Sequence, residues 1–521
     1  MQWNEGEILI LRYLCPVFEK FQPMGKLKSL FSDSIIYGLS SIVGRFLNYL
    51  LVPLYTYKIA AESGGYGVVT NLYAYTALLL VILTFGMETT FFRFANKDGV
   101  DSEKAYSTSL LFVGALSAFF VLLCTVFLTP ISNALDYATH PEYIEVMAII
   151  VAIDAFQAIM FADLRRRKRA WKFAILKLAF IFFNIGLNLF VFLVAPALAQ
   201  THPSLMAWYD PSYQVGYIFW INLVCTAGIT LGFIPELKRI RSGLDFELLK
   251  QMLRYAFPLL LLGLVGILNQ VADKICFRFI VPGQEGEVQL GIYGACVKIA
   301  MIMAVITQAF RYAYEPLVFG GHKDKNNKEF QALATKYFVM FTLLAFLCVV
   351  FYIDILKYIV KADYWEALRA VPIVMMAEIF MGIYFNLSFW YKLTDETWWG
   401  ALFSGIGCAL LLAVNFVFVP QYGYMACAWG GFVGYGTCML LSYIVGQKKY
   451  YVPYPVWTIL GYFALALGLY AVSVYFRPES QALVFVMNTG LLLVYLAVVA
   501  FNERAVVKGV VATVKRKLLH R

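Results

Sequence analysis

Charged and amide side chains occur inside long apolar stretches of this sequence. Arg45 and Asn48 are three residues apart and would share one face of a helix. Asn269, Lys298 and Arg311 occupy apolar stretches of the second half. Since Lys and Arg are the natural partners of phosphate groups, Lys298 and Arg311 could pass a diphosphate along a pathway. We expect these five residues to line a cavity, although Arg45 could instead be neutralised by a carboxylate on a neighbouring helix.

Carboxylates also occur in these stretches. Asp154 and Glu378 lie near the middle of theirs, and Glu88 lies near the end of another. A carboxyl held out of water can exchange protons near neutral pH, so these three are candidates for ion coupling. The alternative is structural pairing of Asp154 and Glu378 with Arg45 or Lys298. Arg311 has its own alternative partner in Glu315, four residues further along.

The composition indicates an integral membrane protein. Of 521 residues, 61% are hydrophobic and only 14% are charged, whereas soluble chains carry about 25% charged residues. We expect about fourteen transmembrane helices. They lie near 34–57, 67–92, 105–129, 142–162, 171–197, 213–234, 251–275, 289–316, 334–356, 366–390, 397–419, 422–446, 455–476 and 480–501. The short connections leave no room for a soluble catalytic domain.

The basic residues predict the orientation. Most of the 42 Lys and Arg residues lie in the terminal segments and in every second connection. This asymmetry predicts that both termini are cytoplasmic. The densest run, Arg165 to Arg169, lies between two apolar stretches and is interpreted as an anchor to lipid headgroups rather than a nucleic-acid site.

An internal repeat divides the chain. At an offset of about 224 residues, Leu123–Phe127 aligns with Leu347–Phe351, Gly67 with Gly291, and Asp154 with Glu378. The fold class is therefore all-α, with two parallel six-helix repeats around a central cavity plus two C-terminal helices. The predicted units are a cytoplasmic segment 1–33, with a possible start at Met24, bundles 34–234 and 251–446, a linker 235–250, helices within 455–501 and a basic tail 502–521.

Signatures of enzymes and metal sites are absent from the sequence. The four His residues lie in connections or the tail, the nine Cys residues form no C-x-x-C pair, and there is no Walker A sequence. We therefore expect no catalytic residues, no metal and no cofactor.

Several motifs resemble those of a known family. Ser41-Ile-Val-Gly-Arg-Phe-Leu-Asn48, Tyr66-Gly67, Gly86-Met-Glu88, Ala272-Asp-Lys274 and Leu290-Gly-Ile-Tyr293 resemble the polysaccharide-transporter proteins, which include the O-antigen and capsule flippases. That group belongs to the multidrug/oligosaccharidyl-lipid/polysaccharide exporter superfamily. The resemblance covers roughly residue 26 to the end of the fourteenth predicted helix.

The resemblance implies a flippase of the bacterial inner membrane that translocates an undecaprenyl-diphosphate-linked oligosaccharide by alternating access. Membrane lipids and polysaccharide polymerase or assembly proteins are the other expected partners. The alternatives are a lipid II flippase or a cation-coupled multidrug exporter of the same superfamily, and a membrane glycosyltransferase or polymerase is less favoured. The basic cavity residues of the family are carried over to Arg45, Lys298 and Arg311.

Overall fold

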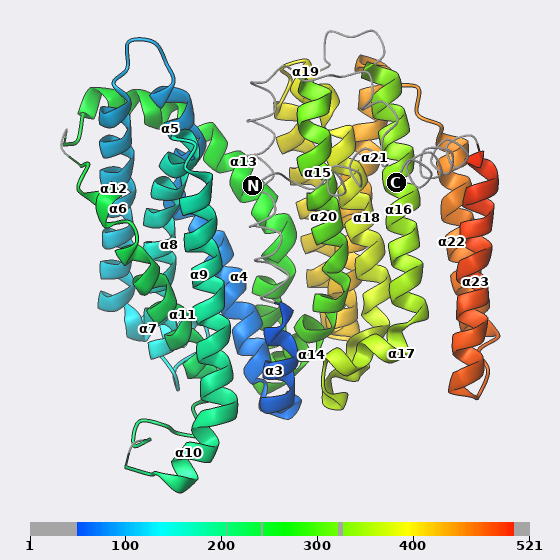
Figure 1. Ribbon diagram of the computed structural model, residues 1–521, viewed down its shortest axis with the longest axis horizontal. Helices are drawn as coiled ribbons and strands as arrows, with labels where there is room; N and C mark the ends of the chain where they lie inside the picture. The colour runs from blue at the N-terminus through cyan, green and yellow to red at the C-terminus, as the bar shows by residue number, and fades with distance from the viewer. Residues whose placement is uncertain (1–48, 205, 241–242, 321–326, 505–521) are drawn as a thin grey trace, which may run out of the picture.

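The computed structural model describes residues 49–204, 206–240, 243–320 and 327–504. Every regular element in these ranges is a helix (Figure 1). The first half contains α3 (Leu51–Lys58), α4 (Gly65–Thr84), α5 (Met87–Ala95), α6 (Ser102–Val126), α7 (Leu128–Ala134), α8 (Glu142–Arg166), α9 (Ala170–Leu189), η3 (Phe190–Val194), α10 (Ala195–Thr201), α11 (Gln214–Leu231) and α12 (Ile234–Leu237).

The second half begins with α13 (Phe246–Ile280), which is the longest described helix. It continues with α14 (Gly283–Ala300), α15 (Ile302–Gly320), α16 (Asn327–Phe351), α17 (Ile353–Leu356), η4 (Lys357–Ile359), η5 (Ala362–Ala370), α18 (Val371–Leu387), α19 (Phe389–Leu393), α20 (Trp398–Tyr422) and α21 (Tyr424–Lys449). The chain then adds α22 (Val456–Tyr475) and α23 (Gln481–Asn502).

Twelve described helices are long and apolar enough to cross a membrane, and the pair α14 and α15 makes a thirteenth span if it is counted as one. Most of the predicted span 34–57 lies outside the described residues. The continuous helix expected over 289–316 was wrong, because α14 and α15 are bent by 42°. The Met301 N–H bonds to the carbonyls of both Val297 and Lys298, which indicates a locally tightened turn at the bend.

The helices pack in the same pattern in both halves. In the first half α8 packs against α4, α6 and α11, and α9 packs against α11. In the second half α18 packs against α14, α16 and α21, and α20 packs against α21. These are equivalent pairs in the two repeats, so the predicted fold class of two parallel six-helix repeats is confirmed. The added helices α22 and α23 pack on α16.

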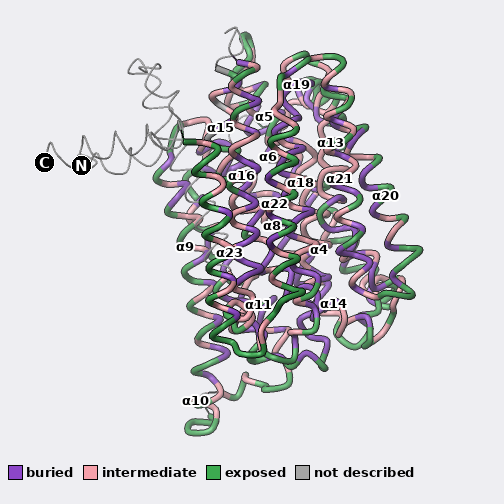
Figure 2. Tube along the Cα trace, turned by 90° about the vertical axis from the view of Figure 1, so that its right-hand side faces the viewer, coloured by how far each residue is buried: buried purple, intermediate pink, exposed green. Residues whose placement is uncertain are grey.

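Each long helix has buried and exposed positions along its length (Figure 2), and many of the exposed positions are large apolar side chains. Phe182 is 76% exposed and Trp457 is 87% exposed, as is expected of surfaces that face lipid acyl chains or the membrane interface. Hydrogen bonding within each helix satisfies the backbone, which is the condition for crossing a bilayer. The packing and the outward surface together describe a multi-pass membrane protein.

The connections alternate between two ends of the molecule. We call the end that contains residues 96–101, 167–169, 238–240, 243–245, 394–397 and 450–455 the basic end, and the opposite one the far end. In Figure 1 the helices α5 and α19 mark the basic end, at the top, and α7, α10 and α17 mark the far end.

Helix α13 belongs to both halves. Near its start, Leu248, Met252 and Ala256 are part of a buried cluster formed with α5, α6 and α8. Near its end it packs on α20 of the second half. Pro258 lies between these two parts, and a proline inside a helix removes one backbone hydrogen bond.

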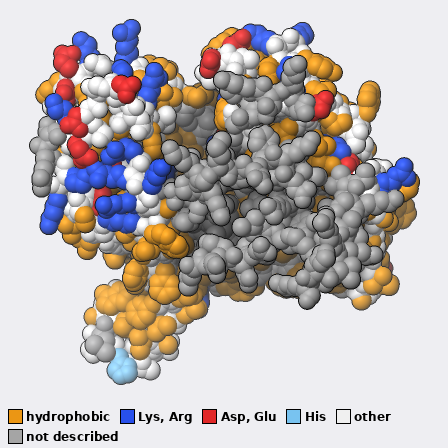
Figure 3. Space-filling view, turned by 45° about the horizontal axis from the view of Figure 1, so that its top comes forward, with side chains coloured by type: hydrophobic (Ala, Val, Ile, Leu, Met, Phe, Trp, Pro, Cys, Tyr) orange, Lys and Arg blue, Asp and Glu red, His pale blue; other side chains and the backbone are white. Residues whose placement is uncertain are grey.

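A buried carboxylate organises the basic end of the first half. The Asp163 side chain is fully buried and binds Arg166 at 2.9 Å, Arg167 at 3.0 Å and Arg239 at 2.6 Å. Glu103 of α6 binds Arg239 at 2.6 Å and also binds Arg167. Figure 3 shows Lys and Arg side chains interspersed with Asp and Glu on this face. Part of the basic run 165–169 therefore connects α6, α8 and the segment after α12 through ion pairs.

We expect Asp163→Asn to destabilise the protein, because three guanidinium groups lose their shared negative charge. Breaking a buried ion pair costs about 3–5 kcal/mol. The melting temperature of the purified protein in detergent should fall clearly. The matched control is Asp98→Asn, which removes an exposed carboxylate of the same end. Equal melting temperatures for the two variants would contradict the role of Asp163.

Candidate functional site

The two halves approach each other most closely where α4 crosses α14, near the far end. A Cβ atom placed on Gly291 would lie 2.9 Å from the backbone nitrogen of Gly67, and one placed on Gly294 would overlap Thr70. We call Gly67, Gly291 and Gly294 the glycine contact. Any larger side chain at Gly67 or Gly291 would force the two backbones apart, so these positions require glycine.

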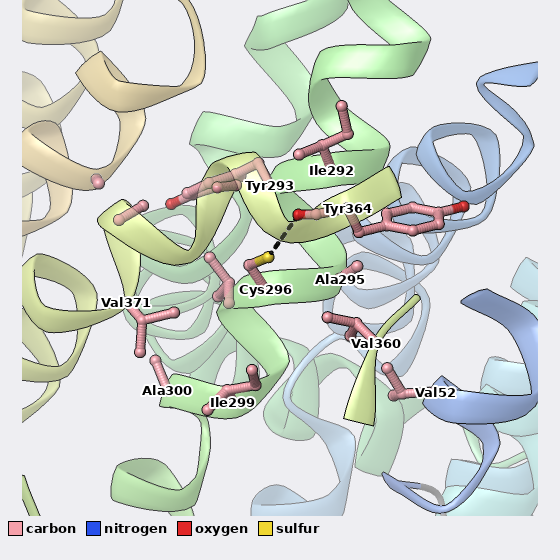
Figure 4. Packing of buried hydrophobic residues seen from close by; sticks show 14 of the residues in the cluster. Val52, Ile292, Tyr293, Ala295, Cys296, Ile299, Ala300, Val360, Tyr364 and Val371 are labelled. Carbon is pink, nitrogen blue, oxygen red and sulfur yellow. Dashed lines mark hydrogen bonds between the residues drawn. The ribbon is translucent and has the colours of Figure 1, made fainter. Parts of the chain in front are cut away.

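Hydrogen bonds join the halves around the glycine contact. The Tyr364 hydroxyl donates to the Ile59 carbonyl at 3.0 Å, and the Asn71 amide donates to the Lys274 carbonyl at 2.8 Å. In the buried cluster of Figure 4, Cys296 of α14 points to the carbonyl of Tyr364 and donates to it at 3.0 Å. Segments α3, α4, α14 and η5 are thereby held together.

An ion pair also joins the two halves near the glycine contact. Arg278 of α13 is 6% exposed and binds Asp136, which follows α7, at 2.8 Å. It also lies 3.0 Å from Glu287 of α14. We call Arg278, Asp136 and Glu287 the far-end latch. Burial holds the pKa of the adjacent Tyr137 hydroxyl well above its usual range, so this hydroxyl stays neutral and donates to Asn71 at 2.9 Å.

Lys298 lies on the same stripe of α14 as the glycine contact. It follows Gly291 and Gly294 by seven and four residues, so its side chain continues the face that is turned toward α4. Lys298 is half-buried, and within the described chain no carboxylate forms an ion pair with it. Among the described residues, the ammonium of Lys274 lies close enough to repel it.

Two carboxylates lie near these ammonium groups. Lys274 binds the adjacent Asp273 at 2.9 Å, and the Tyr293 hydroxyl donates to Asp273 at 3.4 Å. Glu378 of α18 interacts electrostatically with both Lys274 and Asp273. We call Asp273, Lys274, Lys298 and Glu378 the central charged cluster. It combines two cations and two anions inside the second half, and one of the cations, Lys298, has no direct partner among the described residues.

Asp154 lies in a separate cluster inside the first half. It lies close enough to Lys177 of α9 to interact with it electrostatically. Asp154 and Glu378 occupy equivalent positions in the repeat, but the structure places each in its own bundle beside a lysine. Lys177 is a charged neighbour of Asp154 that the sequence did not predict, and the pairing expected with Arg45 falls outside the described residues.

The other expected residues are distributed over different parts of the fold. Arg311 binds Glu315 at 3.4 Å, as the structural alternative proposed. Glu88 binds Arg165 at 2.7 Å at the basic end. Asn269 is 3% exposed and donates to the Ser404 carbonyl of α20 at 2.9 Å. Arg45 and Asn48 lie outside the described residues.

The far-end latch and the contacts of Asp273 and Lys274 were not predicted from the sequence. For Asp273 and Lys274 the sequence did hold a signal, because two opposite charges are adjacent within an apolar helix. No sequence pattern links Arg278 to Asp136, because the two are 142 residues apart.

The fold and this arrangement of charges define a multi-pass membrane protein with two pseudo-equivalent bundles, which is a transporter architecture. The family described as "Polysaccharide biosynthesis protein" matches residues 30–314. The match covers more than half of the chain, and the protein belongs to this family.

Known proteins share part of this sequence or this fold. A protein of the Lsg locus of Haemophilus influenzae is 21% identical over 310 residues, which are 57% of this chain and 67% of that protein. Among solved structures, the lipid II flippase MurJ in an inward closed conformation has a TM-score of 0.67 at 13% identity and covers 90% of this chain and 99% of its own. An inward-facing MATE transporter of the MOP superfamily has a TM-score of 0.57 at 14% identity, and the match covers 78% of this chain and 94% of that one. The fold is therefore shared with transporters.

We expect Arg278→Gln to loosen the far end, because it removes the charge that joins Asp136 to Glu287. Spin labels on Gln200→Cys and Gln421→Cys, which are exposed far-end positions in the two halves, would report their separation by pulsed electron paramagnetic resonance. The distance distribution should broaden and shift to longer values. The eight described cysteines are buried or half-buried, which favours labelling at the new sites.

The matched control is Arg477→Gln. Arg477 binds Asp354 at 2.5 Å at the same end, but both of these residues belong to the second half. A similar shift in the two variants, or none in Arg278→Gln, would contradict a latch between halves.

Proposed function

We propose that this protein translocates a lipid-linked oligosaccharide across the bacterial inner membrane by alternating access, with an undecaprenyl-diphosphate-linked repeat unit of O-antigen, capsule or exopolysaccharide as the substrate. The observation that carries the proposal is Lys298, a half-buried ammonium without a carboxylate partner in the described chain, beside the contact between two repeated bundles. The family membership, in polysaccharide biosynthesis, supports the substrate class.

The proposed mechanism assigns the diphosphate to Lys298, with Lys274 close enough to add to the positive potential. Charge-assisted hydrogen bonds from an ammonium to phosphate are stronger than neutral ones. The polyprenyl tail stays in the lipid, and the sugars occupy the space between the halves. Arg45 and Asn48, on the neighbouring predicted helix, are carried over from the family resemblance as further contacts.

The contacts at the far end suit a reversible closure. They combine backbone packing at glycines, a buried apolar cluster that includes residues of both halves, a few hydrogen bonds and one ion-pair group. Opening these contacts while the basic end closes would expose the substrate on the other side. The excess of basic residues supports a cytoplasmic basic end. Polymerase and assembly proteins on the far side are proposed recipients of the glycan.

A second candidate is translocation of lipid II, which also carries a diphosphate. The overlap with the lipid II flippase MurJ over 99% of that chain favours it. Complementation of a strain depleted of its lipid II flippase would separate the two candidates. A cationic drug is a less suitable substrate, because Lys298 would repel it.

We expect Lys298→Ala to reduce transport by about tenfold or more, because a hydrogen bond to a charged group contributes roughly 1.5–3 kcal/mol. Lys298→Arg should retain most of the activity. The measurement is surface polysaccharide produced by cells that express each variant, normalised to the amount of protein in the membrane. Lys448→Ala, at an exposed position of the basic end, is the control. Unchanged surface polysaccharide in Lys298→Ala would remove Lys298 from the mechanism.

A further inference from the structure

A cavity of about 890 Å³ lies away from the central charged cluster, between α16, the segment 453–455 and the two added helices. Its lining residues are Glu329, Ala332, Leu333, Lys336, Pro453, Pro455, Trp457, Thr458, Gly461, Tyr462, Leu465, Val498, Asn502 and Glu503. Charged groups therefore line one part of the wall, and apolar side chains of α16, α22 and α23 line the rest.

The cavity lies at the depth of a membrane interface. It is bounded by the first residues of α22 and the last residues of α23, both at the basic end. Trp457 at its rim is 87% exposed and the neighbouring Phe501 is 72% exposed. Tryptophan concentrates where acyl chains meet headgroups. A molecule that entered this cavity from the bilayer would bring its polar end to the charged wall.

The charged wall is preorganised around Glu503. Lys336 of α16 binds Glu503 at 2.7 Å, and their side chains are only 13% and 11% exposed. The hydroxyls of Tyr337 and Tyr462 each donate to Glu503 at 3.2 Å. An ammonium has three N–H donors, and the bond to Glu503 uses one of them. Lys336 can therefore donate to a further anionic group without losing its partner.

Glu329 supplies a second carboxylate on the same face. It lies seven residues before Lys336, which is two helical turns or about 10 Å along the axis. Glu329 is exposed, and the structure records no ion pair for it within the described chain. Its flexible side chain can turn toward the cavity and accept hydrogen bonds from a cationic group.

The charge of the lining restricts the ligand. One lysine and two glutamates give the wall a net negative charge, which disfavours lipids with a purely anionic headgroup. A phosphate could still bind Lys336 if the same molecule carried an ammonium for Glu329. A primary ammonium donates hydrogen bonds, whereas a quaternary one cannot.

We propose that this cavity binds a phospholipid with a primary ammonium in its headgroup, of the phosphatidylethanolamine class. The phosphate accepts hydrogen bonds from Lys336, the ammonium donates to Glu329, and the acyl chains lie along Leu333, Leu465 and Val498. The lipid fills the space between α16 and the helices α22 and α23. It thereby stabilises the attachment of these two helices to the second half.

A glycine that lines the cavity can be replaced by a large side chain that fills it. No atom lies within 4 Å of a Cβ placed on Gly461, which lines the cavity. Gly468 lies two turns further along α22, has equally open space and is not among the lining residues. Gly461→Trp should therefore occupy the lipid site, while Gly468→Trp adds the same side chain elsewhere on this helix.

The test measures the melting temperature of the purified full-length protein in detergent with added lipids of matched acyl chains. Phosphatidylethanolamine should raise it in a saturable manner, and phosphatidylcholine and phosphatidylglycerol should raise it much less. Gly461→Trp and Glu329→Gln should each lose most of the ethanolamine-specific rise, and Gly468→Trp should keep it. Glu329→Gln keeps the test decisive if Gly461→Trp does not fold.

Equal rises with all three phospholipids would overturn the proposal, as would an unchanged ethanolamine-specific rise in both Gly461→Trp and Glu329→Gln. An equal rise with undecaprenyl phosphate, which has no ammonium, would show that an apolar chain rather than the headgroup is recognised and would also overturn it. Because the readout is stability, the result is independent of which glycan the protein transports.

Discussion

The close approach of two backbones at Gly67 and Gly291 is the constraint on which the rest of the structure depends. These glycines are equivalent positions of the internal repeat, and they touch each other. Equivalent points of a two-fold arrangement can meet only near its axis. The pseudo-two-fold axis of the molecule therefore passes close to this contact. Because the axis passes here, the two bundles are equivalent around the glycine contact, and Lys298 lies beside their junction.

Several other charged side chains within the helices are neutralised by an oppositely charged partner. Arg278, Arg311 and Glu88 each have an oppositely charged partner, and Asp163 serves three arginines. Removing a charge from water is costly unless it is paired, so most of these groups stabilise the fold. Lys298 has no carboxylate bound to it in the described chain, and its ammonium is therefore available to a ligand.

The sequence predicted the fold class well because membrane spans depend on local composition. The repeat was also visible, since equivalent residues such as Gly67 and Gly291 keep a constant offset. The bend at Met301 was not predictable, because no proline or glycine marks it. Residues that act across long distances were missed for a different reason. The pairing of Arg278 with Asp136, or of Glu88 with Arg165, depends on which helices become neighbours, and apolar periodicity does not specify that. The proposed roles of Arg45 and Asn48 remain predictions, since both lie outside the described residues.

Helix α13 makes the two bundles mechanically dependent on each other. Its first part is fixed in the core of the first half through Met252 and Ala256, and its last part is fixed in the second half through Asn269 and Arg278. If the halves rotate against each other, a rod anchored at both ends must bend, twist or slide between its anchors. Pro258 lies in that interval, where the backbone lacks one hydrogen bond. The free-energy difference between the conformations of this protein must therefore include the elastic deformation of a single helix.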